Sequence, residues 1–180
     1  MPWFALTVKP QHEKTVAEQL RFKELESYLP LYCSRRRWSD RVKTIQLPLF
    51  SQYVFSQFDL GERVRVLQTA GVLSIVSFGG APCPVETGQL EDLRAIVGSG
   101  LPYSPWPFLH AGQRVRICGG PLKGVEGILA REKSEHRVVV NMELLQRAVA
   151  VEVARDLVIP CPECRVGAAS AIRRPALACA

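Results

Sequence analysis

The sequence predicts an α+β fold with an N-terminal sheet and flanking helices, a linker, and a small C-terminal β-barrel. The chain opens with a strand-like run and a helical stretch, a pair that needs a sheet to pack on. Residues 98–107 are rich in Gly and Pro, which is the composition of a linker. Five short strand patterns then follow within about fifty residues and indicate a small barrel. The expected parts are an N-terminal domain over 1–98, a linker over 99–109, a barrel domain over 110–160 and a mostly disordered tail over 161–180.

Length and composition narrow the class of protein. A chain of 180 residues with 47% hydrophobic and 22% charged residues suits one domain or two small ones. The net charge of +6 and the pI of about 9.2 fit a polyanionic partner. A strand-like run begins at Trp3 with no signal-peptide pattern, and no apolar run approaches the roughly 18–20 residues of a membrane span. We therefore expect a cytoplasmic protein with no membrane partner.

The first elements follow from hydrophobic periodicity. Residues 3–8 form the first predicted strand, and a helix is predicted from residue 13 to about 26, with an apolar stripe that includes Val16 and Leu20. An edge strand is expected over 28–34, because Pro30 has no N–H to donate to a sheet.

Residues 35–43 hold five basic side chains and one acidic one around Trp38, and Ser39 and Asp40 suit a hairpin tip. One interpretation is a solvated β-hairpin whose charges protect a sheet edge. The other is a basic finger that contacts phosphates, with Trp38 stacking on an unpaired base. The basic residues are Arg35, Arg36, Arg37, Arg41 and Lys43.

The stretch over 48–58 predicts a strand around which the domain is organised. Apolar and polar residues alternate up to Leu49, but at Tyr53, Val54 and Phe55 apolar side chains would point to both faces. Such a strand must be covered on both sides. The second cover is either the domain's own helices, as in an ordinary central strand, or a partner protein held by the aromatic side chains.

The rest of the N-terminal half alternates between helix and strand. A short helix is predicted over 61–68 and a strand over 73–78. A second helix is expected from an N-cap at Thr87 to Gly98. Its apolar residues, which include Leu90 and Leu93, are most simply a core stripe.

The C-terminal half has the sequence pattern of a β-domain. A tight Gly-rich loop is expected over 119–124 and one helical turn over 142–145. Strands are predicted over 114–117, 125–130, 137–141, 148–153 and 157–159.

Neither a metal site nor an enzyme is indicated. Of the six cysteines only Cys161 and Cys164 have ligand spacing, and the second pair that a structural zinc site needs is missing. The three histidines lie far apart without motif context, and the glycines over 119–124 lack the Gly-Lys-Ser/Thr of a phosphate-binding loop. We expect no cofactor and no catalytic residues.

Four motifs resemble NusG-type transcription factors. WFALxVKP over 3–10, PLFxxYxF over 48–55 and GVxxxVxFG over 71–79 resemble their N-terminal (NGN) domain, and GQRVRIxxGPLKGVEGIL over 112–129 resembles a KOW motif. The details are most similar to the RfaH-like antiterminators, although Ser51 stands where the family usually has Pro. The resemblance covers residues 3–160 and implies an antiparallel N-terminal sheet and an SH3-like C-terminal barrel.

The same resemblance implies a function. Proteins of this kind bind the clamp helices of the RNA polymerase β′ subunit, contact upstream or non-template DNA, and suppress pausing or termination, in the RfaH-like case at chosen operons. Their KOW domain recruits a ribosomal protein or the Rho helicase. We therefore expect a monomeric elongation and antitermination factor. The alternative is a ribosome- or RNA-binding KOW protein, which suits the basic residues but leaves the N-terminal motifs unexplained.

The resemblance also assigns candidate sites. The residues expected to bind polymerase are Phe50, Tyr53, Phe55, Phe78, Leu90 and Leu93. Those expected to contact nucleic acid are Lys9, Arg35, Arg36, Arg37, Trp38, Arg41 and Lys43. Those expected to bind a partner of the KOW domain are Ile117, Leu122 and Lys123.

Some RfaH-like domains start as a helical hairpin and switch to a barrel, but we expect a stable barrel here. Valines occupy 138–140 and positions 149, 151 and 153. Their β-branched side chains lose rotamer freedom in a helix and favour strands.

Overall fold

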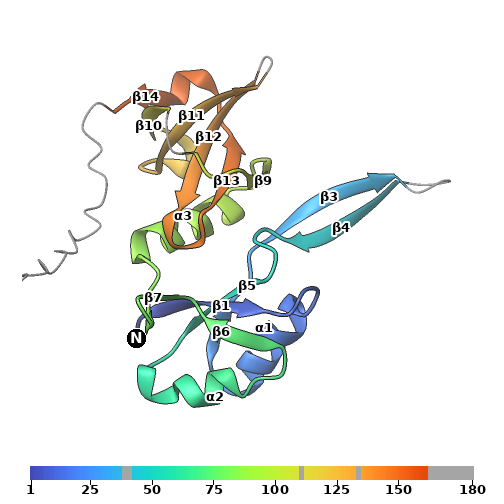
Figure 1. Ribbon diagram of the computed structural model, residues 1–180. Helices are drawn as coiled ribbons and strands as arrows, with labels where there is room; N and C mark the ends of the chain where they lie inside the picture. Colours follow the sequence, from blue (N-terminus) through green and yellow to red (C-terminus); the bar gives the residue numbers. More distant parts are fainter. Residues whose placement is uncertain (38–41, 110–111, 133–134, 162–180) are drawn as a thin grey trace, which may run out of the picture.

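The protein is described here by a computed structural model, shown in Figure 1, that covers residues 1–37, 42–109, 112–132 and 135–161. An N-terminal and a C-terminal domain are joined through helix α3, and a β-hairpin projects from between them. The elements of the N-terminal domain are β1 (Trp3–Val8), α1 (Glu13–Phe22), β2 (Glu26–Tyr28), β3 (Leu31–Arg37), β4 (Val42–Pro48), β5 (Tyr53–Gln57), η1 (Leu60–Glu62), α2 (Arg63–Leu67), β6 (Val72–Ile75), β7 (Ser77–Phe78), β8 (Ala81–Pro82) and α3 (Thr87–Gly98).

The N-terminal sheet has four strands in the order β2-β5-β1-β6, and its neighbouring strands are antiparallel. Side chains alternate between its two faces. Val54 packs with α1 and α2 on one face, whereas Phe55 packs with α3 on the other. The predicted antiparallel sheet with flanking helices is therefore confirmed, and the protein's own helices cover both faces of β5.

Several predicted boundaries change for local reasons. Helix α1 ends at Phe22, earlier than predicted, because the chain turns at Glu24 with a φ of 61°. The strand expected over 28–34 is divided between β2 and β3, with Pro30 in the break. The strand expected over 73–78 is interrupted at Val76, whose N–H donates to the Ala5 carbonyl. Thr87 is the first residue of α3 and not its N-cap.

The hairpin of β3 and β4 forms a two-stranded sheet of its own. Its pairing runs from Leu31 opposite Pro48 to Arg37 opposite Val42, and it extends away from both domains. The predicted tip at Ser39 and Asp40 lies outside the described residues.

The C-terminal domain is a six-stranded antiparallel sheet in the order β14-β10-β11-β12-β13-β9. All five predicted strands are present, and the predicted helical turn is a short 3₁₀ turn, so the described part of this domain is β-structure and not a helical hairpin. Its elements are β9 (Tyr103–Trp106), β10 (Gln113–Ile117), η2 (Gly120–Leu122), β11 (Glu126–Glu132), β12 (Glu135–Met142), η3 (Glu143–Leu145), β13 (Arg147–Glu152), η4 (Arg155–Leu157) and β14 (Val158–Pro160).

Strand β9 was not predicted, because it lies inside the expected linker. It pairs with β13, so that Val149 lies opposite Pro105 and Val151 opposite Tyr103. Part of the interval assigned to a linker is thus an edge strand of the C-terminal domain.

Helix α3 connects the two hydrophobic cores. One continuous apolar cluster contains Phe55 from the sheet, Leu93 from α3, and Leu122 and Val140 from the C-terminal domain. The two domains therefore pack against each other through this helix, an arrangement that we call the closed arrangement (Figure 1). Among the described residues, no helix is both long and apolar enough to cross a membrane.

Candidate functional site

The turn between β4 and β5 carries the aromatic motif to the junction of the two domains. Leu49 and Phe50 are buried, and the Phe50 ring meets the Phe55 ring edge-on at a centroid distance of 6.2 Å. The turn is held from the opposite side by Glu13, whose carboxylate accepts a hydrogen bond from the Gln52 N–H at 2.8 Å. Gln52 has a φ of 69°, so the chain reverses here with an exposed Ser51 in place of the family's Pro. The sequence motif thus forms a rigid corner.

Five of the six residues expected to bind polymerase lie together in the closed arrangement. Phe50, Phe55, Leu90 and Leu93 are buried in the cluster that α3 shares with both domains, and the half-buried Tyr53 packs against it. The sixth lies elsewhere, because Phe78 is on the short β7–β8 hairpin with 68% of its surface exposed.

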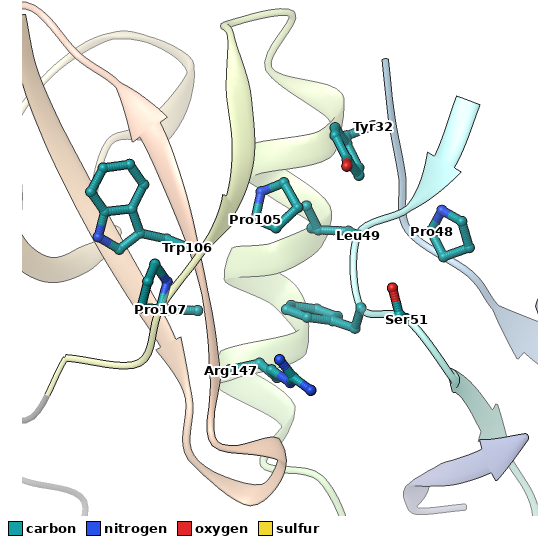
Figure 2. Close-up of a pocket in the computed structure, with 10 residues that line it drawn as sticks. Tyr32, Pro48, Leu49, Ser51, Pro105, Trp106, Pro107 and Arg147 are labelled. Atoms are coloured by element: carbon teal, nitrogen blue, oxygen red, sulfur yellow. The ribbon is translucent and has the colours of Figure 1, made fainter. Parts of the chain in front are cut away.

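A cavity of about 480 Å³ opens beside this corner. One wall is the base of the β3–β4 hairpin with the turn that follows it, and the other is β9 and the start of β13. Figure 2 shows Leu49 and Pro105 meeting across it, with Tyr32 at one end and Arg147 at the other. Each wall belongs to a different domain, so the cavity exists only in the closed arrangement.

Arg94 attaches α3 to the sheet, a role that the sequence did not suggest. Its guanidinium lies 4.7 Å from the centroid of the Trp3 ring and 5.2 Å from that of Tyr28, and one of its nitrogens lies 3.9 Å from a Glu26 carboxylate oxygen. Stacking on two aromatic faces is a favourable use of Arg. Burial raises the pKa of Tyr28 to about 12, and its hydroxyl has no hydrogen-bond partner in the part of the chain that the structure describes.

Helix α3 also carries a partly buried carboxylate, that of Asp92. Burial, together with the negative charges of Glu126, Glu91 and Glu86, raises the pKa of Asp92 to about 6. Glu126 belongs to β11 of the C-terminal domain and is ion-paired with Arg116. Asp92 is therefore a carboxylate that the fold partly removes from water without a cationic partner among the groups that shift its pKa.

The basic residues expected to contact nucleic acid are placed as follows. Lys9, Arg35 and Lys43 are exposed. Arg36 lies opposite Lys43 in the hairpin and Arg37 opposite Val42. Trp38 and Arg41 fall outside the described residues. The described basic positions of the hairpin thus lie on a projecting two-stranded arm and not in a pocket.

The three residues expected to bind a partner of the KOW domain differ in exposure. Ile117 and Leu122 are buried, each 1% exposed, whereas Lys123 is on the surface. Leu122 belongs to η2, which lies against α3. Access to Leu122 would therefore require the domains to separate.

Of the predicted cysteine pair, Cys161 is among the described residues and Cys164 is not. Among the described residues there is no group of three or more His, Cys, Asp or Glu side chains that could hold a metal ion.

Comparison with known proteins adds the following. The sequence pattern of a family described as "Transcription termination factor nusG" matches residues 1–94. The solved structure described as "Domain interaction in Thermotoga maritima NusG" is similar, with 21% identity, a TM-score of 0.55, and 88% of this chain and 96% of that chain covered. Conformation B of an MjSpt4:Spt5 complex matches with 16% identity and a TM-score of 0.29, over 88% of this chain and 95% of that one. A comparison with curated proteins gave no match.

Proposed function

The chain belongs to the NusG family, whose members are transcription factors and not enzymes, and from its site geometry we propose that it binds the clamp helices of RNA polymerase during elongation. Binding there would suppress pausing or termination, and the RfaH-like details of its motifs favour action at chosen operons. The observation that carries this proposal is the aromatic corner of Phe50 and Tyr53 at the junction with α3.

The chemistry of this corner suits a pair of helices. Aromatic side chains that lie close to an apolar helix form a groove of the kind that receives the apolar face of an amphipathic helix. Phe50 lines the cavity and the half-buried Tyr53 packs at the edge of the cluster, whereas Phe55 is fully buried in it. We therefore assign direct contact to Phe50 and Tyr53 and a supporting role to Phe55, Leu90 and Leu93.

In the closed arrangement the corner is covered. Phe50 is 3% exposed, and residues of β9 and β13 form the opposite wall of the cavity beside it. A clamp helix could contact Phe50 only after the C-terminal domain moves away from α3. The apparent affinity for polymerase would then be the intrinsic affinity reduced by the fraction of molecules that are open.

The β3–β4 hairpin is proposed to lie along upstream or non-template DNA. Its arm projects from the polymerase-binding corner and carries Arg35, Arg36, Arg37 and Lys43 on two paired strands. Phosphate contacts of this kind position a protein on DNA without reading the base sequence. Lys9, at the end of β1, would add a further contact from the body of the domain.

Polymerase affinity tests the assignment. Replacing Tyr53 with Ala removes a half-buried aromatic anchor, so we expect binding to weaken about tenfold or more. Phe22→Ala is the matched control, because Phe22 is 93% exposed at the end of α1 and lies outside the cluster. Affinity that falls equally in both variants, or in neither, would contradict the assignment, provided that both proteins are shown to be folded.

A further inference from the structure

Strand β9 is attached to the C-terminal domain as a bound peptide would be. It lies along the edge strand β13 in antiparallel register, with Trp106 opposite Ala148 and Tyr103 opposite Val151. Residues 148–151 are all buried with β9 in place, and an uncovered edge of β13 would leave a row of unpaired backbone groups. In this structure residues 103–106 supply it.

The two aromatic side chains of β9 anchor it from opposite faces, as expected for residues three apart in a strand. Tyr103 packs against the cluster shared by the two domains. Trp106 packs on the other face, against a small apolar cluster of Val139, Ala148 and Ala150. The Arg137 guanidinium lies over the Trp106 ring, 5.5 Å from its centroid.

A polar clamp holds the segment that follows β9. The side-chain amide nitrogen of Asn141 donates to the Leu109 carbonyl at 2.8 Å, and its amide oxygen accepts from the Leu109 N–H at 3.4 Å. A side chain that pairs with both backbone groups of one residue binds an extended chain without depending on its side chain. This side of the domain therefore combines a sheet edge, an aromatic anchor site and a backbone clamp.

The segment in this groove is short and joined to α3 by a short connection. Pro105 has no N–H to donate, so one position of β9 cannot pair fully with β13. On its N-terminal side residues 99–102 separate it from α3, with Gly100 at a φ of 73°. The Tyr103 hydroxyl also donates to the Leu31 carbonyl at the base of the hairpin, at 2.6 Å. Movement of the N-terminal domain would therefore pull directly on β9.

We propose that the groove along β13, between the Trp106 site and Asn141, binds an extended segment of a partner protein, and that residues 103–109 occupy it as an internal ligand. The partner segment runs antiparallel to β13 and places aromatic side chains three residues apart. It tolerates Pro between them, because Pro105 already occupies that position. The proposal goes beyond polymerase binding, since it requires neither polymerase nor DNA.

Tethering explains why the site would be masked. A segment joined to its site by a short linker competes at an effective concentration in the millimolar range. A partner strand of similar chemistry therefore binds poorly until β9 is weakened or pulled away. Release of the Tyr103–Leu31 hydrogen bond as the domains separate is the structural event that would unmask the groove.

A peptide with the sequence of residues 101–109 provides the probe, used with the full-length protein. Trp106→Ala weakens the internal ligand and leaves the groove unchanged, so the labelled peptide should bind this variant about tenfold more tightly than the wild type. Amide shift changes should be confined to 137–152 and the segment 103–109. Tyr103→Ala weakens the same strand from its other face, so the peptide should bind this variant too more tightly than the wild type.

Two comparisons keep the test specific. Phe22→Ala, an aromatic loss far from the groove in sequence and outside both clusters, should leave peptide binding at the wild-type level. Asn141→Ala added to Trp106→Ala removes the clamp and should weaken the peptide about fivefold. The proposal is overturned if the peptide binds the wild type, Trp106→Ala and Tyr103→Ala equally, or if it binds none of these three proteins. It is also overturned if the amide shift changes lie outside the groove.

Discussion

Replacing Asp92 with Asn is expected to stabilise the closed protein near neutral pH. Burial, together with the charges of Glu126, Glu91 and Glu86, raises the pKa of Asp92 to about 6. In the unfolded chain the carboxyl has its ordinary pKa, so it ionises more readily there than in the folded protein. At neutral pH the wild-type protein therefore bears a cost that a neutral Asn side chain would not.

The sign and size of this cost follow from proton linkage. Below about pH 3 the carboxyl is largely protonated in both states and costs little; the cost develops as the pH rises from about 3 to 6 and is complete above that. A rise of about two pK units corresponds to about 3 kcal/mol at full burial. Because Asp92 is only half-buried, solvent screening reduces this figure by roughly half, to about 1–1.5 kcal/mol.

Chemical denaturation of the wild type and Asp92→Asn across this pH range measures the effect. We expect the variant to be more stable by about 1–1.5 kcal/mol near pH 7.5, equivalent to a rise in Tm of about 2–5 °C, with the difference disappearing by about pH 3. Glu18→Gln is the control, since it removes the same charge from an exposed position on α1 and Glu18 is not among the groups that shift the pKa of Asp92. An equal gain in the control, or an undiminished gain at about pH 3, would refute the reasoning.

Two further predictions concern the hairpin and the C-terminal sheet. Charge reversal at both Arg36 and Arg37 should lower DNA crosslinking within the elongation complex and reduce the salt dependence of DNA binding by about two ions. Reversal at the exposed Arg21 and Arg63 is the control and should do neither. Equal crosslinking by the two variants would mean that the hairpin is a solvated sheet edge and does not contact DNA. Gly127→Ala should destabilise the protein by about 1–3 kcal/mol in thermal unfolding. Its Cβ would lie 2.6 Å from the Val139 carbonyl oxygen, whereas a Cβ at Gly88 meets nothing within 4 Å, so Gly88→Ala is the control and a loss in both would contradict the steric explanation.

The elements of the fold could be predicted where the pattern is local. Alternation of apolar residues placed the strands of both domains, and the two-faced apolar pattern at Val54 and Phe55 correctly indicated a strand covered on both sides. Strand β9 could not be found this way, because the sequence around Pro105 has the composition of a linker. It is a strand only because the buried edge of β13 offers it hydrogen bonds from about forty-five residues further along the chain.

The candidate site shows the same division. Phe50 and Tyr53 could be identified from their motif, since an aromatic cluster beside a turn is visible in sequence. The cation–π contacts of Arg94 and the buried charge of Asp92 could not, because each depends on which residues the fold brings to α3. Phe78 is a different case: the short β7–β8 hairpin leaves its side chain exposed and apart from the other five residues, so its part in polymerase binding stays a prediction.

Helix α3 couples the two proposed binding events, that of polymerase and that of a partner strand. Its apolar residues face the sheet on one side and the C-terminal domain on the other within one cluster, and the same junction holds the Phe50 corner and the Tyr103 hydrogen bond. A clamp helix that contacts Phe50 must displace the C-terminal wall of the cavity, and that displacement strains the attachment of β9. Because coupling between two binding events is reciprocal, a partner strand that replaces β9 must favour polymerase binding by the same factor. The free energy of this coupling can be no larger than the difference in free energy between the closed and open arrangements.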